Sequence, residues 1–342
     1  MIPIAPHITA FLQKRLPLER QASSHTSDTY AYAFQLFFGF ASQRLGTPPS
    51  RLNLEDLDAP MVLAFLDHLE SDRHNSPTTR NARLAAIKSF MNYVQYQVPS
   101  SLEQVRRILA IPTKKCHSRL VNYLSAEEMQ AILDAPDPRS RDGIRDRAMV
   151  YLAFAAGLRV SELVGLTMDD VSLQPSPTIR VRGKGRRERQ LPLWKEATTT
   201  LRAWMAIRGP AAVPEIFLNA RGQPLTRSGF EYVLDKHAVM AAKKHPSLLK
   251  KRVSPHVLRH TCAMTALQAT NDLRKVSLWL GHASIQTTEI YLRADPTEKL
   301  AAIESMVPPP LRRGRFRPPD RLIAALRTGR PLCGVERAGS RA

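Results

Sequence analysis

The chain has little cysteine and no long apolar run. Its three cysteines, Cys116, Cys262 and Cys333, lie far apart and form no Cys-x-x-Cys pair. Neither a disulfide framework nor a zinc site is indicated, and a reducing compartment fits. No uninterrupted stretch of about 18 apolar residues occurs, and the first residues lack a basic segment followed by an apolar one. We therefore expect a cytoplasmic protein without a membrane segment.

Acidic residues are also scarce. Asp and Glu number 30 against 50 Lys and Arg, so the formal net charge is +20. A positive field of this size concentrates polyanions, and each cation that neutralises a phosphate releases counterions. Ribosomal or membrane-surface binding would also suit a basic chain. A hydrophobic content of 43% is ordinary for a globular protein, and the positive charge is not confined to one amphipathic helix. The composition favours a folded nucleic-acid-binding protein.

The length allows two domains, and the first is predicted to be helical. Apolar residues recur at helical spacing in three stretches: Ala31, Phe34, Phe37 and Phe38; Met61, Ala64, Phe65 and Leu69; and Leu84, Ile87, Phe90, Met91 and Val94. We expect residues 1–100 to form a helical DNA-binding domain. Its basic residues Arg80, Arg83 and Lys88 either face DNA phosphates or belong to a solvated charged face.

A basic linker and a second domain follow. Residues 101–120 hold a short possible helix and then a stretch without a sustained period, which we interpret as the linker. Ser125 and Glu128 show the capping-box pattern that opens a helix, and the second domain is expected to span residues 121–307. Residues 308–342 are rich in Arg, Pro and Gly and are predicted to form a basic, flexible tail.

The second domain is predicted to be mainly helical with a small antiparallel β-sheet or hairpin. A mostly apolar helix over 142–156 ends at Gly157. Short β-prone runs at 178–181 and 189–193 flank the cationic hairpin tip at 182–187. Further helices are expected at 195–207, 226–242, 256–269, 272–280, 284–293 and 297–306.

This domain carries residues suited to cleaving a phosphodiester without a metal. Such a reaction needs a nucleophile, cations on the non-bridging oxygens, and an acid for the leaving oxygen. Arg159 and Arg259 suit the cationic part, because a guanidinium binds phosphate bidentately and stays charged. Glu162 lies three residues after Arg159, so its carboxylate either orients that guanidinium or forms an ordinary surface pair with it.

A tyrosine and two histidines complete the candidate site. Ser254 and Pro255 predict a helix start that places His256 in the first turn, where the helix dipole favours a neutral, proton-accepting imidazole. The neighbouring His260 is interpreted as structural. His282 and Tyr291 would point to opposite sides of one continuous helix, so a bend at 281–284 is required to bring them together. In isolation, His282 could equally be a capping residue and Tyr291 a core aromatic.

The leaving-group acid is expected on the hairpin. Lys184 at its tip could reach the 5′-oxygen and donate a proton, or it could simply contact phosphate. Arg182, Arg186 and Arg187 are expected to make DNA contacts. The glycine spacing around Lys184 is not that of a P-loop.

In this order, the candidate residues resemble the signature of the tyrosine recombinases, the phage integrase family. They are Arg159, Lys184, His256, Arg259, His282 and Tyr291. The strings Gly-Leu-Arg-Val-Ser-Glu-Leu (157–163), His-Val-Leu-Arg-His-Thr (256–261) and Leu-Gly-His-Ala-Ser-Ile-Gln-Thr-Thr-Glu-Ile-Tyr (280–291) look like the motifs of this family. The resemblance covers residues 121–307, and the helical N-terminal region is similar to the core-binding domain of the family.

The resemblance implies a two-domain clamp on double-stranded DNA. Tyr291 would attack the scissile phosphate, forming a 3′-phosphotyrosine and freeing a 5′-hydroxyl. Arg159, Arg259 and His282 would bind the phosphate, His256 would act in acid/base transfer, and Lys184 would protonate the leaving oxygen. No metal, ATP or other cofactor is implied.

The resemblance also implies an assembly and a setting. Four protomers, either a homotetramer or a set with related recombinases, would act on two DNA sites. A mobile element would encode this nucleoid-associated protein. Two other functions stay open at this point: a type IB topoisomerase-like relaxing enzyme, and a non-catalytic DNA-binding protein on the same fold.

Overall fold

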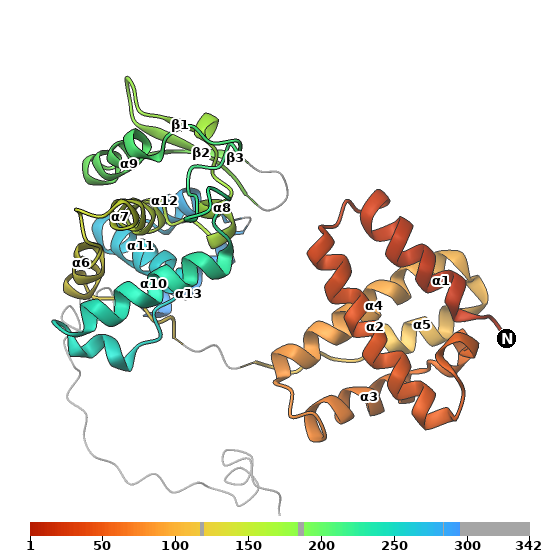
Figure 1. The fold of residues 1–342 in the computed structure, drawn as a ribbon. Coiled ribbons are helices and arrows are strands. Elements are labelled where there is room, and N and C mark those ends of the chain that lie inside the picture. Colours follow the sequence, from red (N-terminus) through yellow and green to blue (C-terminus); the bar gives the residue numbers. More distant parts are fainter. Residues whose placement is uncertain (117–119, 184–187, 283, 295–342) are drawn as a thin grey trace, which may run out of the picture. The chain divides into compact units, whose positions relative to one another are not determined.

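The computed structural model describes residues 1–116, 120–183, 188–282 and 284–294, and the chain divides into two compact units (Figure 1). The first unit comprises residues 1–119 and the second residues 120–342. Each unit has a hydrophobic core of its own. No helix in the part of the chain that the structure describes is long and apolar enough to cross a membrane.

Where it is described, the first unit is built from helices, with one isolated β-bridge between Pro3 and Asn53. Its main helices are α1 (Ile4–Ala10), α2 (Ser24–Leu45), α3 (Ala59–Ser71), α4 (Pro77–Gln97) and α5 (Leu102–Leu109). The π-helix η1 (Phe11–Glu19) continues α1, and the short 3-10 helices are η2 (Pro49–Arg51), η3 (Leu54–Asp56) and η4 (Pro99–Ser101). Side-chain caps begin α3 and α4, since Asp58 accepts from the Met61 N–H and Ser76 from the Thr79 N–H.

Helix α5 lies inside the stretch that the sequence suggests is a linker. Val105 and Ile108 on α5, and Ile111 after it, are buried in the core of the first unit. This is the short helix that the sequence allowed in this stretch, and its eight residues offer only two turns of pattern. The first unit therefore extends past residue 100.

The basic residues of α4 are engaged within the first unit. Lys88 donates to the carbonyls of Leu109 (2.7 Å) and Ile111 (2.6 Å). Its ammonium group therefore caps the C-terminal end of α5. Arg80 is only 4% exposed and donates to the Pro112 carbonyl at 3.1 Å. This position differs from the DNA-facing one that the sequence allowed, since the cation holds the segment after α5 against α4.

The second unit packs helices around α7 and carries one small sheet. Its elements are α6 (Ala126–Asp134), α7 (Arg141–Ala155), α8 (Val160–Val164), η5 (Met168–Asp170), β1 (Val171–Ser172), β2 (Thr178–Arg182), β3 (Glu188–Pro192), α9 (Lys195–Arg208), α10 (Arg227–Ala242), η6 (Pro246–Lys250), α11 (Pro255–Thr270), α12 (Leu273–Leu280), η7 (Ile285–Thr287) and α13 (Glu289–Ala294). The sheet is antiparallel in the order β1-β2-β3, and Arg182 pairs with Glu188 at the hairpin end. The predicted mainly helical fold with a small antiparallel sheet is confirmed.

The region after α12 differs in detail from the predicted helix over 284–293. It consists of the 3-10 helix η7 followed by α13. Ser284 accepts from the Gln286 N–H, which starts a new short element after Gly281 ends α12. The predicted helix over 297–306 lies outside the described residues.

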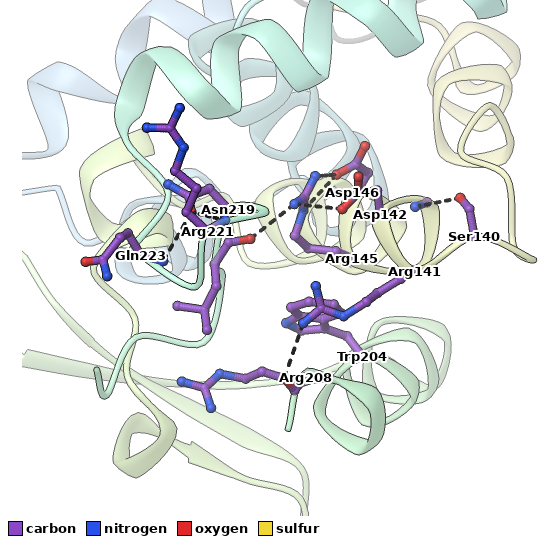
Figure 2. Close-up of polar contacts among 12 residues, drawn as sticks. Ser140, Arg141, Asp142, Arg145, Asp146, Trp204, Arg208, Asn219, Arg221 and Gln223 are labelled. Atoms are coloured by element: carbon purple, nitrogen blue, oxygen red, sulfur yellow. Dashed lines mark hydrogen bonds and ion pairs between the residues drawn. The ribbon is translucent and has the colours of Figure 1, made fainter. Parts of the chain in front are cut away.

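A buried polar cluster holds α7 in place (Figure 2). Arg145 on α7 forms ion pairs with Asp142 (3.1 Å) and Asp146 (2.7 Å) and donates to the Leu218 carbonyl at 3.1 Å. On the far side of Asp146, the buried His237 of α10 lies 2.9 Å from its carboxylate. These contacts tie α7 to α10 and to the turn after Leu218, and α7 leads directly into the Arg159 segment.

Candidate active site

Arg159 lies at the start of α8, immediately after the turn that ends α7. Gly157 adopts φ +56°, which reverses the chain after α7. The Arg159 backbone N–H donates to Glu162 Oε2 at 2.9 Å, and its guanidinium donates to Glu162 Oε1 at 2.7 Å. The contact between these side chains, expected from their spacing, is present. The Arg159 side chain is 31% exposed.

Glu162 is the centre of an arginine cluster. Its side chain is only 4% exposed, and Arg189 of β3 donates to both of its oxygens, at 3.2 and 2.9 Å. The Arg259 guanidinium of α11 lies 4.0 Å from Glu162 Oε2. Burial raises the pKa of Glu162, but the hydrogen bonds from Arg189 and Arg159 outweigh it and the pKa is lowered overall. Glu162 is therefore a buried carboxylate that stays ionised.

Arg259 is held by backbone carbonyls from two other segments. Its guanidinium donates to the carbonyl of Gly157 and, at 2.7 Å, to the carbonyl of Leu280. Burial and the charge of Arg159 lower the pKa of Arg259 to about 10, and this value still keeps it charged at neutral pH. The turn after α7, helix α11 and the end of α12 thus meet at one cation.

His282 follows the C-terminal turn of α12. Gly281 adopts φ +63°, the left-handed conformation that ends the helix, so the expected bend between His282 and Tyr291 is present. His282 Nδ1 lies 2.8 Å from Thr288 Oγ1, and the His282 ring stacks on Tyr291 with centroids 6.5 Å apart. Burial and the charges of Arg259 and Arg159 lower the pKa of His282 to about 4, which leaves a neutral imidazole at physiological pH.

Tyr291 lies in α13 with its phenol buried. The side chain is 1% exposed, and its hydroxyl lies 3.0 Å from His260 Nδ1. Burial raises the pKa of Tyr291 to about 12, although the nearby charges of Arg259 and Arg159 act in the opposite direction. The phenol is therefore protonated and needs a proton acceptor before it can attack.

Of the two histidines of α11, His256 lies where it was expected and His260 makes an unexpected contact. Ser254 caps the helix as predicted, and His256 is exposed in its first turn, without a hydrogen bond to any other described residue. His260, interpreted from the sequence as structural, is the histidine that contacts the tyrosine hydroxyl. One helical turn separates the two, and only the packing of α13 against α11 shows which one meets Tyr291.

The expected DNA-contacting residues are only partly described. Lys184, Arg186 and Arg187 lie outside the described residues. Arg182 is exposed at the end of β2 and lies 3.5 Å from both Asp170 and Glu188. In the first unit, Arg83 is half-buried with its guanidinium over the Tyr32 ring at 4.9 Å. Among the described residues, no group of three His, Cys, Asp or Glu side chains is placed to hold a metal ion.

Two features of the site are not apparent from the sequence: the role of Arg189 and the contact made by His260. Arg189 lies in a β-strand far from Glu162 in sequence, so no spacing rule relates the two. The strand alternation could have indicated that Arg189, a charged residue, points to the same side as the buried Leu191. The resulting cluster of three arginines, one buried carboxylate and a neutral histidine can bind and polarise a phosphate beside a tyrosine.

The chain is similar to several known proteins. Residues 122–298 match the phage integrase family, and residues 8–98 match its N-terminal SAM-like domain. A Sinorhizobium fredii protein whose name assigns it to the integrases/recombinases, y4rC, is 44% identical over 94% of this chain and 97% of its own length. Tyrosine recombinase XerC of Pelobacter propionicus is 32% identical over 85% of this chain and 91% of its own length.

A solved structure shares the fold. The site-specific recombinase XerH, crystallised on a palindromic difH substrate after cleavage, aligns with a TM-score of 0.66 and 23% identity. The alignment covers 87% of this chain and 84% of that one. On the family match across both units and the identity to its members, the chain belongs to the phage integrase family, the tyrosine recombinases.

Proposed function

We propose that this chain recombines DNA at specific sites through a covalent 3′-phosphotyrosine at Tyr291. The observation that carries the proposal is the position of the phenol, which contacts His260 and lies in the field of Arg259 and Arg159. The family membership supplies the reaction class, DNA strand cleavage and rejoining. Energy from the broken phosphodiester is kept in the phosphotyrosine, so the step needs no ATP.

The proposed reaction transfers the scissile phosphoryl group from the 5′-oxygen of DNA to the Tyr291 oxygen. The Tyr291 oxygen forms a bond to phosphorus while the bond from phosphorus to the 5′-oxygen breaks. Arg159, Arg259 and His282 bind the non-bridging oxygens, and the phenolic proton passes to a histidine of α11, His256 or His260. Lys184 gives a proton to the 5′-oxygen. Because the phenol is 1% exposed, it must leave its buried position before it reaches DNA.

The partners and setting belong to the same proposal. We propose double-stranded DNA as the substrate and four protomers on two sites as the acting assembly, because one solved relative of the fold is a lambda integrase tetramer bound to a Holliday junction. Association with the nucleoid follows from DNA binding and the net charge of +20. An origin in a mobile element is supported by the resemblance to the transposon Tn1549 integrase fold.

The test uses nicked suicide substrates that carry sequences flanking the gene. Wild-type protein should form a covalent protein–DNA adduct with a 3′-phosphotyrosine link, and Tyr291→Phe should form none. Tyr232→Phe is the matched control, because that tyrosine is 72% exposed on α10 and should leave adduct formation unchanged. If the wild type forms no adduct on any such substrate, the enzyme proposal fails. Relaxation of a plasmid without a defined site would point to a topoisomerase instead.

A further inference from the structure

We propose that Arg189 is a positioning residue: by occupying two acceptor sites of Glu162, it limits how far this carboxylate draws Arg159 and Arg259 away from the scissile phosphate. This inference rests on the proposed function. Arg189 lies in β3, outside the residues that the family resemblance assigns to the reaction, and its side chain is 12% exposed. Its fork binds both oxygens of the Glu162 carboxylate, at 3.2 and 2.9 Å.

The hydrogen bonds at Glu162 show what Arg189 prevents. A carboxylate offers about four lone-pair sites, and here two are taken by Arg189, one by the Arg159 N–H and one by the Arg159 guanidinium. Arg259 lies 4.0 Å away without a hydrogen bond to the carboxylate. If Arg189 were lost, two buried lone-pair sites would open, and Arg259 and Arg159 are the cations close enough to fill them.

The charge balance favours the same role. Three guanidinium groups surround one carboxylate, so the cluster carries an excess of positive charge in a buried place, which suits a phosphate dianion or diester. Without Arg189, Glu162 would neutralise one of the two remaining arginines. The phosphate would then compete with an internal carboxylate for its own binding groups.

Arg189 also packs against the turn that carries His282. A Cβ placed on Gly281 would lie 2.9 Å from Arg189 Cδ and 3.0 Å from its NH1. The Arg189 Nε is buried and has no hydrogen-bond partner among the described residues, so the side chain is placed for Glu162 and the Gly281 turn and not for solvent. One side chain thereby joins β3 to two segments of the site.

Loss of Arg189 has two possible effects on cleavage: weaker phosphate binding, or poorer protonation of the leaving oxygen. In the sequence Lys184 lies between the strands β2 and β3, so displacement of the leaving-group acid is a second possible effect of losing Arg189. A substrate with a 5′-thiol leaving group distinguishes the two, because a thiolate departs without protonation. A defect in phosphate binding persists on that substrate, whereas a defect in acid catalysis disappears.

The experiment compares adduct formation at saturating DNA for a set of full-length variants. Arg189→Met should slow the step by about 10²-fold, the size of effect seen when one transition-state donor is misplaced, on both the oxygen and the sulfur substrates. Arg189→Lys should recover part of the rate, because it keeps the charge but not the fork. The double variant Arg189→Met/Glu162→Gln should be faster than Arg189→Met, because a carboxamide no longer draws the other arginines inward.

An exposed arginine on the neighbouring strand provides the control variant. Arg180→Met changes an exposed arginine of β2 that pairs with Asp170, and it should cleave like the wild type. If Arg189→Met does not fold, the comparison of Arg189→Lys with Arg189→Lys/Glu162→Gln tests the same competition. The inference is overturned by a wild-type rate in Arg189→Met, by full recovery on the sulfur substrate, or by no gain in the double variants. Absence of any adduct from the wild type would remove the proposed function itself.

Discussion

The hydroxyl of Tyr291 lies against a histidine, and that contact decides which proton acceptor is available in this state. His260 Nδ1 is 3.0 Å from the phenol oxygen, and burial, together with the charges of His256 and Arg259, lowers the pKa of His260. A neutral His260 at physiological pH can accept the phenolic proton. The exposed His256 makes no comparable contact among the described residues.

We expect His260→Leu to slow adduct formation about 10²-fold or more at pH 7, because general-base catalysis contributes effects of this order. The wild-type rate should be flat from about pH 7 to 9, since His260 is already neutral there when its pKa lies below the usual value. In His260→Leu the rate should rise with pH, because hydroxide must then deprotonate a phenol whose pKa is about 12.

The measurement is single-turnover adduct formation across this pH range, with His256→Leu as the comparison. The assignment of the base to His260 is wrong if His256→Leu acquires the steep pH dependence and His260→Leu keeps the flat profile. A circular dichroism spectrum and a melting curve for each variant show whether the fold is retained.

Single residues of the site were predictable where sequence spacing alone places them. Arg159 and Glu162 share a helical turn, and the hydrogen bond between them is present. Arg189 and His260 were missed because their partners come from distant segments, β3 with α8 and α11 with α13. The motif residues show which chemical groups are supplied, but not which of them touch.

The turn after α12 illustrates how one element positions the site. Gly281 has φ +63° and packs against Arg189, and the next residue is His282. Gly46 ends α2 in the same left-handed conformation, at φ +65°, with open space around it. Both glycines therefore need a positive φ. A Cβ at position 281 would collide with Arg189, whereas a Cβ at position 46 would have open space around it.

We expect Gly281→Ala and Gly46→Ala to lower the free energy of unfolding by a similar backbone cost of about 1–2 kcal/mol each. Gly281→Ala should lose more unfolding free energy than Gly46→Ala, because its Cβ must displace Arg189. Of the two variants, only Gly281→Ala should slow adduct formation. Denaturant unfolding and the suicide-substrate assay measure the two effects. A wild-type rate of adduct formation in Gly281→Ala would show that the contact between Gly281 and Arg189 does not matter to the reaction.

Helices with strong periodicity and caps were predicted close to their observed bounds. α9, α11 and α12 lie within one or two residues of their expected ranges, and Ser254 and Asp272 cap the last two. α5 corresponds to the short possible helix in the stretch interpreted as a linker, but its membership in the first unit becomes apparent only when Val105 and Ile108 pack into the core. Short elements depend on tertiary contacts for their definition.

The net charge is a property of the whole molecule, and residues 308–342 contribute a large share of the positive charge. That segment contains nine arginines, one aspartate and one glutamate. Each arginine that neutralises a phosphate steepens the salt dependence of DNA binding and adds no sequence preference.

We therefore expect a variant ending at residue 307 to bind DNA more weakly at about 50 mM salt, with the difference shrinking towards about 200 mM. The loss should be equal on site-containing and unrelated duplexes. Fluorescence anisotropy over a salt series measures the slope, and a full-length variant with the nine arginines changed to glutamine controls for chain length. An unchanged slope in both variants would exclude phosphate contacts by this segment.

The fold class, the family and the chemical groups of the site can all be read from the amino-acid sequence. These follow from local information: helical periodicity, capping residues, net charge, and motif residues in a set order. Tertiary structure decided that Glu162 is shared by Arg159, Arg189 and Arg259, and that His260 meets a buried Tyr291. The physical reason is that such contacts join segments far apart in the chain, whose approach depends on how buried surfaces pack and not on covalent spacing.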